Sequence, residues 1–404
     1  MAPRRVAVTG LGAISALGND VSCFWNALIA GRSGIARIES VDLSGLRFQN
    51  GAEVRDYDPA QHFEPSQADL LDRFAQFALI AARQAVRDAG IEFTPELRQR
   101  TAIVTGSSVG GQSTQDSQFW EVYGRKSPRV HPLTIARIMP NAGASHISME
   151  FGITGPAFTV STACASSNHA IGQAFWMVRS GAAELAIAGG SETPFSFGFL
   201  KAWEAMRVIA PDTCRPFSRD RRGLILGEGA AMLVLEPLER AQALGASVYA
   251  EIAGFGMSAD AGHITTPSTD GPARAMQAAL QDAAVAPDAV GYINAHGTGT
   301  PNNDPTETRA IRQVFGGHAE KLAVSSTKSM HGHALGAASA LEAVATVLAL
   351  RNGMLPPTAN FTTPDPECDL DVIPNEARPA EVEYALSNAF AFGGLNAVLA
   401  FRRV

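Results

Sequence analysis

Short β-rich runs alternate with longer alanine-rich runs of helical period along the whole chain of 404 residues. Strands separated by helices at this spacing predict an α/β architecture with buried sheets. The expected strands cover residues 5–9, 102–105, 157–160, 186–188, 230–235, 248–252, 292–294, 323–325 and 397–401. The expected helices cover residues 71–89, 166–179, 271–283, 306–314 and 337–352.

A weak internal repeat relates the two parts of the chain. The matching segments are residues 5–12 with 249–256, 102–111 with 291–300, and 188–190 with 392–394. The helix after Cys164 also has a counterpart after His333. A repeat on this scale predicts two similar α/β halves, 1–245 and 246–404, joined near residues 237–247.

Charge and composition exclude several classes of protein. The net charge is −7 and the pI about 5.7, which argues against a broad nucleic-acid-binding surface. The chain has no run of about 18 uncharged apolar residues, so we expect no membrane span, and its first residues contain no apolar signal segment. The four cysteines lie far apart without a C-x-x-C pair. We therefore expect neither a zinc site nor disulfides, and a cytoplasmic location.

The first segment whose residues could take part in catalysis is V-S-T-A-C-A-S-S-N-H at residues 160–169. A strand-like stretch meets small residues and then a helix whose first turn would contain Cys164. The unpaired amides and positive dipole end of that helix would favour the thiolate and could also hold an oxyanion. The alternative is a buried structural cysteine.

The second segment is N-A-H-G-T-G-T-P at residues 294–301. His296 follows a short strand and stands in a glycine-containing turn, where it could donate to a carbonyl oxygen. Thr298 and Thr300 could bind a ligand chain. A turn histidine bonded to the backbone is the alternative.

The third segment is S-S-T-K-S-M-H-G-H-A-L-G at residues 325–336. Lys328 and His333 stand five residues apart across a turn, where the lysine could keep the histidine neutral and position a carboxylate. A solvated surface lysine is the alternative. His331 and His333 could bind a metal with His296, but no acidic or cysteine partner has ligand spacing, so we expect no catalytic metal.

Two further segments are weaker. Phe390 and Phe392 lie in S-N-A-F-A-F-G-G-L-N, which we interpret as a glycine-rich loop before a strand, and they could form a core or a mobile aromatic gate. Gly10 and Gly12 follow a strand in the manner of a dinucleotide fingerprint, which would indicate a nicotinamide-dependent oxidoreductase. Ser15 stands at the third glycine position and no acidic residue follows at the expected place, so this alternative is distant.

Together, a Cys, two His and a Lys in this order resemble the β-ketoacyl-(acyl carrier protein) synthase family of the thiolase superfamily. The motifs that carry the resemblance are T-A-C-A-S, H-G-T-G-T-P with Asp304 and Glu307 downstream, S-S-T-K-S-M-x-G-H, R-P-F from Arg215 and G-E-G from Gly227. The similarity covers essentially the whole chain. It implies an α/β, thiolase-like, five-layered αβαβα fold made of two duplicated halves, and a homodimer.

The Cys-His-His set is that of the elongating synthases in this family, and the presence of Cys164 disfavours a chain-length factor. The resemblance implies that Cys164 takes an acyl chain from acyl-carrier protein, and that His296 and His333 act on the malonyl thioester and help its decarboxylation. Lys328 would set the electrostatics around His333. The backbone amides of Cys164 and Phe392 would form the oxyanion hole. No cofactor is needed beyond the phosphopantetheine of the substrates.

The resemblance also implies residues for binding. Thr298 and Thr300 would contact the malonyl-pantetheine arm, while Val109, Trp203 and Phe390 would line the acyl pocket and its gate. Arg125, Lys126 and Arg207 match docking positions of the family, and with Arg129, a basic neighbour in the sequence, they would form a small basic patch for an acidic carrier protein. By analogy, Glu342, Ser387 and Asn388 would hold a structural monovalent cation.

The chain departs from the common family pattern at three places. His331 stands where Thr is usual, Ala391 replaces a Gly between the two phenylalanines, and Leu395 replaces the Thr of G-G-T-N. These positions surround the acyl entrance, so they bear on substrate choice and leave the Cys, His, His and Lys set intact. Housekeeping fatty-acid synthesis and a specialised pathway, polyketide or nodulation-type, both remain open, as do the acyl chain length and the cognate carrier.

Overall fold

The computed structural model describes residues 3–404 and contains two sets of five strands with the same topology. The first set is β1 (Val6–Ser15), β4 (Thr101–Gly106), β5 (Ala157–Val160), β6 (Leu185–Glu192) and β7 (Gly229–Pro237). The second set is β8 (Ala250–Ala259), β9 (Val290–Asn294), β10 (Ala323–Ser325), β13 (Tyr384–Ala391) and β14 (Leu395–Arg402). Two short pairs, β2 (Ala36–Arg37) with β3 (Asn50–Gly51) and β11 (Met354–Leu355) with β12 (Arg378–Pro379), lie outside them.

The order and direction of the strands repeat between the sets. The first set runs β5-β4-β6-β7-β1 and the second β10-β9-β13-β14-β8. In each, the first three strands are parallel, and the last two pair antiparallel with their neighbours. The two sets join where three residues of β1 pair with three of β8. The internal repeat predicted from the sequence is therefore a repeat of topology.

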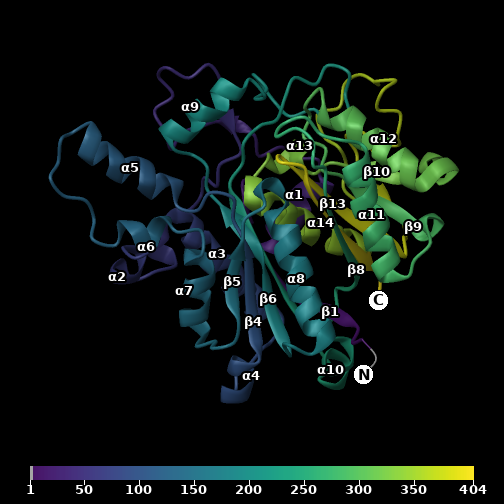
Figure 1. Cartoon of the computed structure of the whole chain (residues 1–404), viewed down its shortest axis with the longest axis horizontal. Helices are drawn as coiled ribbons and strands as arrows, with labels where there is room; N and C mark the ends of the chain where they lie inside the picture. Colours follow the sequence, from purple (N-terminus) through teal and green to yellow (C-terminus); the bar gives the residue numbers. More distant parts are fainter. Residues whose placement is uncertain (1–2) are drawn as a thin grey trace.

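Helices cover both faces of each set, which gives five layers (Figure 1). The outer helices are α3 (Arg73–Asp88) and α7 (Ala142–Phe151) on one side, and α11 (Asp270–Ala283) and α12 (Asn303–Phe315) on the other. The central layer is α8 (Ser166–Ser180) and α14 (Ala338–Asn352). The remaining α-helices are α1 (Val21–Ile29), α2 (Pro65–Ala68), α4 (Pro95–Gln99), α5 (Gln112–Tyr123), α6 (Thr134–Ile138), α9 (Phe197–Met206), α10 (Leu238–Ala243) and α13 (Lys328–His331).

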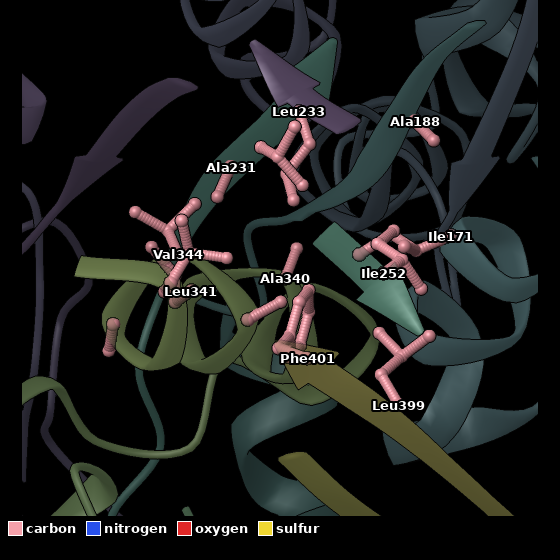
Figure 2. Close-up of a cluster of buried hydrophobic side chains, with 14 of the residues drawn as sticks. Ile171, Ala188, Ala231, Leu233, Ile252, Ala340, Leu341, Val344, Leu399 and Phe401 are labelled. Atoms are coloured by element: carbon pink, nitrogen blue, oxygen red, sulfur yellow. The ribbon is translucent and has the colours of Figure 1, made fainter. Parts of the chain in front are cut away.

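The central helices are buried because both of their faces meet a sheet. Residues 338–350 of α14 are all buried, including its polar residues Ser339, Glu342 and Thr346, as expected for a helix that is covered all round. Figure 2 shows side chains of α8, α14 and strands from both sets meeting in one apolar cluster, with Ile171 near Ile252 and Leu341 near Val344. This cluster joins the two halves, and it places the starts of α8 and α14 next to each other.

Two expectations from the sequence were wrong in detail. Residues 387–391 belong to strand β13, and only 392–394 form the turn to β14, so Phe390 is a strand residue and Phe392 a turn residue. The expected match of 188–190 with 392–394 also fails, because β6 corresponds in topology to β13 and the glycines of Gly189-Gly190 lie within the strand. Short glycine pairs are too common to fix an alignment.

The pair Gly10 and Gly12 has a packing role, which removes the basis for the oxidoreductase alternative. Both residues lie inside strand β1, with no phosphate-binding loop after them. A Cβ atom at Gly10 would lie 2.1 Å from the carbonyl oxygen of Ala85, and one at Gly12 would lie 1.9 Å from that of Ala81. The glycines allow α3 to lie directly against the strand.

No helix of the described residues is long and apolar enough to cross a membrane.

Candidate active site

Cys164 lies in a tight turn between strand β5 and helix α8. Ala163 has a φ of +50°, and residues 163–165 form one 3₁₀ turn before α8 begins at Ser166. His169, one turn into α8, lies within hydrogen-bond distance of the Thr162 hydroxyl (2.9 Å) and the Ala165 carbonyl oxygen (3.1 Å) through Nδ1. A left-handed alanine costs about 1–3 kcal/mol, so such contacts are needed to hold the turn.

The thiol of Cys164 is buried, and burial decides its protonation. Burial raises the pKa of Cys164 to about 11, while Lys328 and the backbone N–H groups of Phe392 and Cys164 act in the opposite direction. The sequence prediction of a thiolate favoured by the helix terminus is therefore incomplete, because desolvation of the sulfur outweighs the nearby dipoles. The sulfur requires a base to remove its proton.

Two histidines lie beside this sulfur. His333 Nε2 is 3.1 Å from Cys164 Sγ, and the rings of His296 and His333 meet edge to face with centroids 5.6 Å apart. One side-chain atom from each of the three residues lies within 4.8 Å of the other two. Three residues separated by up to 169 positions in the sequence thus converge on one point.

His331 does not join this cluster. Its Nε2 lies 3.0 Å from the Thr327 hydroxyl, and its ring faces Phe24. The set of His296, His331 and His333 considered as a metal site is therefore not assembled, and the three residues whose ligand atoms lie close together are Cys164, His296 and His333.

Both histidines beside the sulfur are held neutral. Burial lowers the pKa of His296 and of His333 well below 6.5, and the positive charge of Lys328 lowers both further. A neutral imidazole has one nitrogen that donates and one that accepts. The pair can accordingly donate to a carbonyl oxygen or accept a thiol proton near neutral pH.

Lys328 contacts His296 rather than His333. Its ammonium donates to the His296 carbonyl oxygen at 2.7 Å, lies 3.4 Å from His296 Nδ1, and forms an ion pair with Glu342, with both side chains fully buried. Burial raises the pKa of Glu342 to about 7, and the lysine opposes this rise. The predicted electrostatic effect on His333 is present, but the direct contact is with the other histidine.

Two buried carboxylates hold the turn that carries His296. Glu307 accepts hydrogen bonds from the amides of His296 and Gly297, each at 2.8 Å. Asp304 accepts from the amides of Phe217 (2.7 Å) and Gly299 (3.2 Å). Both acids belong to a sequence motif of the family, but the motif alone does not predict these hydrogen bonds. Their D-x-x-E spacing in the first turns of a helix was the available signal.

Glu192 is a third buried carboxylate that sequence reasoning missed. Located at the end of β6, it accepts from the amides of Ser108 (2.6 Å) and Gly336 (3.1 Å). It therefore ties a loop of the first half to the turn before α14 in the second half. No local sequence pattern distinguishes it from a surface glutamate.

Cys164 lies where two cavities meet. The first cavity, of about 270 Å³, is lined by both histidines, Thr298 and Thr300. The second, of about 420 Å³ and mostly apolar, is lined by Val109 and residues of α9. Three residues line both cavities, namely Cys164, Trp203 and Phe392.

Aromatic side chains surround this junction. The rings of Trp203 and Phe392 stack with their centroids 6.1 Å apart. The ring centroids of Phe390 and His296 are also 6.1 Å apart. The hydroxyls of Thr298 and Thr300 are 2.9 Å apart on the wall of the first cavity. All of the residues predicted for the gate, the pantetheine arm and the acyl pocket thus line one of the two cavities.

The residues predicted for a cation lie in the core. Glu342 Oε2, Ser387 Oγ and Asn388 Oδ1 are buried oxygens that lack a hydrogen-bond partner among the described residues. Unpartnered buried oxygens are costly unless a cation or a water satisfies them, and oxygen ligands suit a hard cation. This donor set therefore fits the predicted ion.

The four predicted docking residues do not lie on one cavity. Arg207 ends helix α9 and lines the cavity of the two histidines, whereas Arg125 lines a separate hollow beside α5. Arg125 also pairs with Glu121 at 2.8 Å, while Lys126 and Arg129 are exposed in the segment that follows α5.

Two family models match the chain in sequence. The first, described as the N-terminal domain of beta-ketoacyl synthase, matches residues 3–241, and the second, its C-terminal domain, matches residues 249–362. The chain belongs to the β-ketoacyl synthase family.

Relatives of this synthase span nearly its full length. It is 50% identical over 401 residues to Nodulation protein E of Rhizobium sp. (strain N33), covering 99% of this chain and 100% of that protein. It is 40% identical over 407 residues to 3-oxoacyl-[acyl-carrier-protein] synthase 2 of Staphylococcus aureus (strain COL), covering 99% and 98%. A solved structure described as the ishigamide ketosynthase/chain length factor matches with a TM-score of 0.95 and 39% identity over 100% of both chains.

These matches confirm the thiolase-like fold and the reaction class predicted from the sequence. The synthase is an acyltransferase of the 3-oxoacyl-(acyl carrier protein) type. Its reaction is the decarboxylating condensation of an acyl group with malonyl-ACP to give β-ketoacyl-ACP, in fatty-acid or specialised acyl-chain biosynthesis.

Proposed function

We propose that Cys164 carries the acyl group during this condensation. The observation that supports the proposal most directly is the position of the sulfur at the junction of two cavities. His333 Nε2 accepts the thiol proton and the sulfur attacks the acyl thioester. The carrier's sulfur then leaves and takes this proton from His333, which becomes neutral again. The acyl chain then occupies the apolar cavity, while the first cavity becomes free for malonyl-ACP. Covalent catalysis of this kind divides one difficult step into two easier ones.

In the second stage, the neutral His296 and His333 donate hydrogen bonds to the malonyl thioester oxygen. The bond to the carboxylate breaks, CO₂ leaves, and the electron pair remains as an enolate on that oxygen. The α-carbon attacks the acyl carbonyl, whose oxyanion is held by the amides of Cys164 and Phe392. The oxyanion then collapses, the bond to Cys164 Sγ breaks, β-ketoacyl-ACP leaves, and the sulfur regains a proton from solvent. The convergence of both amides on the sulfur supports this assignment. Lys328 positions His296 through its carbonyl oxygen and keeps it neutral.

The acyl chain lies against Val109 and Trp203, with Phe390 and Phe392 as the gate. Both phenylalanines line the first cavity, and Phe392 also lines the second, so movement of this turn would change access between them. Replacing Val109 by Phe adds bulk to the wall of the 420 Å³ cavity. This variant should accept shorter chains, and an unchanged acyl-length profile would count against the placement.

A specialised, nodulation-type acyl chain is the substrate that we propose. Four relatives named Nodulation protein E are 47–50% identical to this chain, against 40% for the 3-oxoacyl-[acyl-carrier-protein] synthase 2 sequences. Ala391 lines the first cavity directly, whereas His331 and Leu395 lie close in sequence to the lining residues His333 and Gly394 and do not line either cavity themselves. The competing roles are housekeeping fatty-acid synthesis, which the 40% relatives favour, and a polyketide role, which the 32% identity to a ketosynthase in complex with its type II PKS acyl-carrier protein favours.

The decisive experiment is mass spectrometry of the intact protein after incubation with a panel of acyl-ACPs. We expect mass added at Cys164, fastest for the specialised chain, and none in Cys164→Ala. Equal acylation by all common saturated chains would favour the housekeeping role.

The acyl carrier protein docks near the mouth of the first cavity, where Arg207 lies, with Arg125, Lys126 and Arg129 as an outer basic patch. Reversing the charge of Arg125 and Lys126 tests this role. The cation held by Glu342, Ser387 and Asn388 would stabilise the core without entering the reaction.

A second copy of the chain covers the open side of the acyl cavity in the homodimer that we propose. Strand β5 is an edge strand, and exposed apolar side chains gather on the nearby elements, namely Trp120, Ile135, Met149 and Phe158. Sedimentation at micromolar concentration should give twice the monomer mass.

We further propose that the two halves divide at 245/246 and that the protein works in the cytoplasm, where its four free cysteines would stay reduced.

A further inference from the structure

The cavity that leads to the two histidines has only positive charge on its wall. Its lining residues include two arginines, Arg207 and Arg222, and no aspartate or glutamate. The chain as a whole carries a net charge of −7. A positively charged cavity wall in a protein of negative net charge indicates that the cavity binds an anionic ligand.

The two arginines lie at the exposed end of this cavity. Both side chains are exposed, while Cys164, His296 and His333 at the other end are buried. The histidines are held neutral by burial and by Lys328. The formal positive charges on the cavity wall are therefore those of Arg207 and Arg222 at its exposed end.

Arg222 has no side-chain partner among residues 3–404, in contrast to Arg221 and Arg215 of the same segment. Arg221, the residue before it, pairs with Asp365, and Arg215 pairs with Asp212 at 2.8 Å. Neither Arg222 nor Arg207 forms an ion pair or a side-chain hydrogen bond with any residue in 3–404. A guanidinium without an internal partner retains its five donors for a ligand.

The backbone links Arg222 to the loop that carries the threonines. Gly223 donates its amide hydrogen to the Gly299 carbonyl oxygen at 2.9 Å, and Gly299 lies between Thr298 and Thr300 on the same cavity wall. Arg222 is thus attached to the part of the wall along which an extended substrate arm would run.

We propose that Arg222, together with Arg207, binds the phosphate of the phosphopantetheine arm. The proposal rests on the proposed function, in which this cavity admits a carrier-bound thioester. The arm is a linear chain with the thioester at one end and the phosphate at the other. A thioester beside the buried histidines therefore leaves the phosphate toward the mouth, where an arginine fork can bind two phosphate oxygens.

The test compares two substrates that carry the same acyl group, acyl-phosphopantetheine and acyl-pantetheine, which differ only in the phosphate. For Arg222→Ala we expect KM to rise about tenfold with acyl-phosphopantetheine, as for the loss of a charge-assisted hydrogen bond. KM with acyl-pantetheine should stay nearly unchanged, and Arg222→Lys should show a smaller rise because it keeps the charge without the fork. The matched control is Arg219→Ala, an exposed arginine in the same segment that does not line the cavity.

Three results would overturn the proposal. Equal losses with both substrates would mean that Arg222 supports the fold of the loop. A loss with acyl-ACP alone would mean that the arginine contacts acidic side chains of the carrier. An unchanged KM with acyl-phosphopantetheine would exclude a phosphate contact. A wild-type protein that is not acylated on Cys164 by any of the three substrates would contradict the proposed function itself, which separates the two failures.

Discussion

The turn that carries Cys164 has a counterpart in the second half of the molecule. Ala163 (φ +50°) and Leu335 (φ +46°) each begin a 3₁₀ turn of three residues, and each turn leads into a helix of 15 residues, α8 or α14. Both helices end at a left-handed glycine, Gly181 or Gly353. Cys164 and Gly336 therefore hold equivalent positions in two copies of one backbone motif.

The two turns also bond each other reciprocally. Ser339 of α14 donates to the Cys164 carbonyl oxygen at 3.4 Å, and its equivalent Ser167 of α8 donates to the Gly336 carbonyl oxygen. The equivalent side chains nevertheless meet different surroundings. Cys164 faces two cavities, whereas a Cβ atom at Gly336 would lie 2.5 Å from both Glu192 Oε2 and the Ser108 amide nitrogen.

The difference teaches that the duplicated backbone determines where a residue stands, and the local packing determines what it does. The first half supplies the sulfur and much of the apolar wall. The second half supplies both histidines on turns held by buried carboxylates. The following predictions test this division, beginning with the largest expected effect.

Cys164→Ala should abolish condensation, with a fall in rate of at least about 10³-fold, because no other side chain at the junction is a nucleophile. The circular dichroism spectrum and the melting temperature should remain near wild type, because the substitution removes only the sulfur. Condensation by the folded variant would refute the assignment of the first half as the nucleophile's half.

His296→Ala and His333→Ala should each slow malonyl decarboxylation by about 10²–10³-fold, because each removes one donor to the thioester oxygen. They should differ in the first stage. His333 contacts the sulfur at 3.1 Å, so only His333→Ala should also slow acylation of Cys164, measured by mass spectrometry of the intact protein. If His296→Ala impairs acylation as strongly, the proposed division of roles is wrong.

Gly336→Ala should destabilise the protein by about 1–3 kcal/mol, since the added methyl group would displace Glu192 or the Ser108 backbone. Urea denaturation measures this loss. The control is Gly317→Ala, where a Cβ atom meets nothing within 4 Å. Similar stability of the two variants would show that the second turn has room for a side chain after all.

His331→Thr should reduce the acid sensitivity that the second half gives the protein. Burial and Lys328 lower the pKa of His331 from 6.5 to about 3. Below pH 6.5 the unfolded chain therefore binds a proton that the folded chain rejects, so stability is present above pH 6.5 and falls as the pH decreases toward 3. This group contributes about 1.4 kcal/mol per pH unit in that window. Unfolding free energies measured between pH 6 and 4 should show the smaller slope in the variant, and an identical slope would exclude a buried neutral His331.

The smallest effect concerns the surface of the first half. Changing Arg125 and Lys126 to Glu should raise KM for acyl-ACP only a few-fold at low salt, because exposed charges are screened over about 10 Å at 0.1 M salt. Arg125 already pairs with Glu121, which reduces its contribution. Turnover of acyl-pantetheine should not change. An equal effect on both substrates would identify these residues as structural.

The sequence by itself determined the reaction class, the α/β fold and the duplicated organisation. These properties are readable because they depend on local patterns. Sharp turns require small residues around Cys164 and glycines beside the histidines, and the alternation of strand and helix shows in the spacing of apolar residues. The sequence also indicated Cys164, His296 and His333 as a set, through motifs on three separate segments.

Only the tertiary structure decided how these segments act on each other. Desolvation raises the pKa of Cys164 against the helix terminus, and Lys328 reaches His296 rather than His333. Glu192 and the unpartnered Arg222 gain their importance from residues distant in the sequence. Burial and charge depend on everything that packs around a group, and that sum exists only once the two halves have folded together.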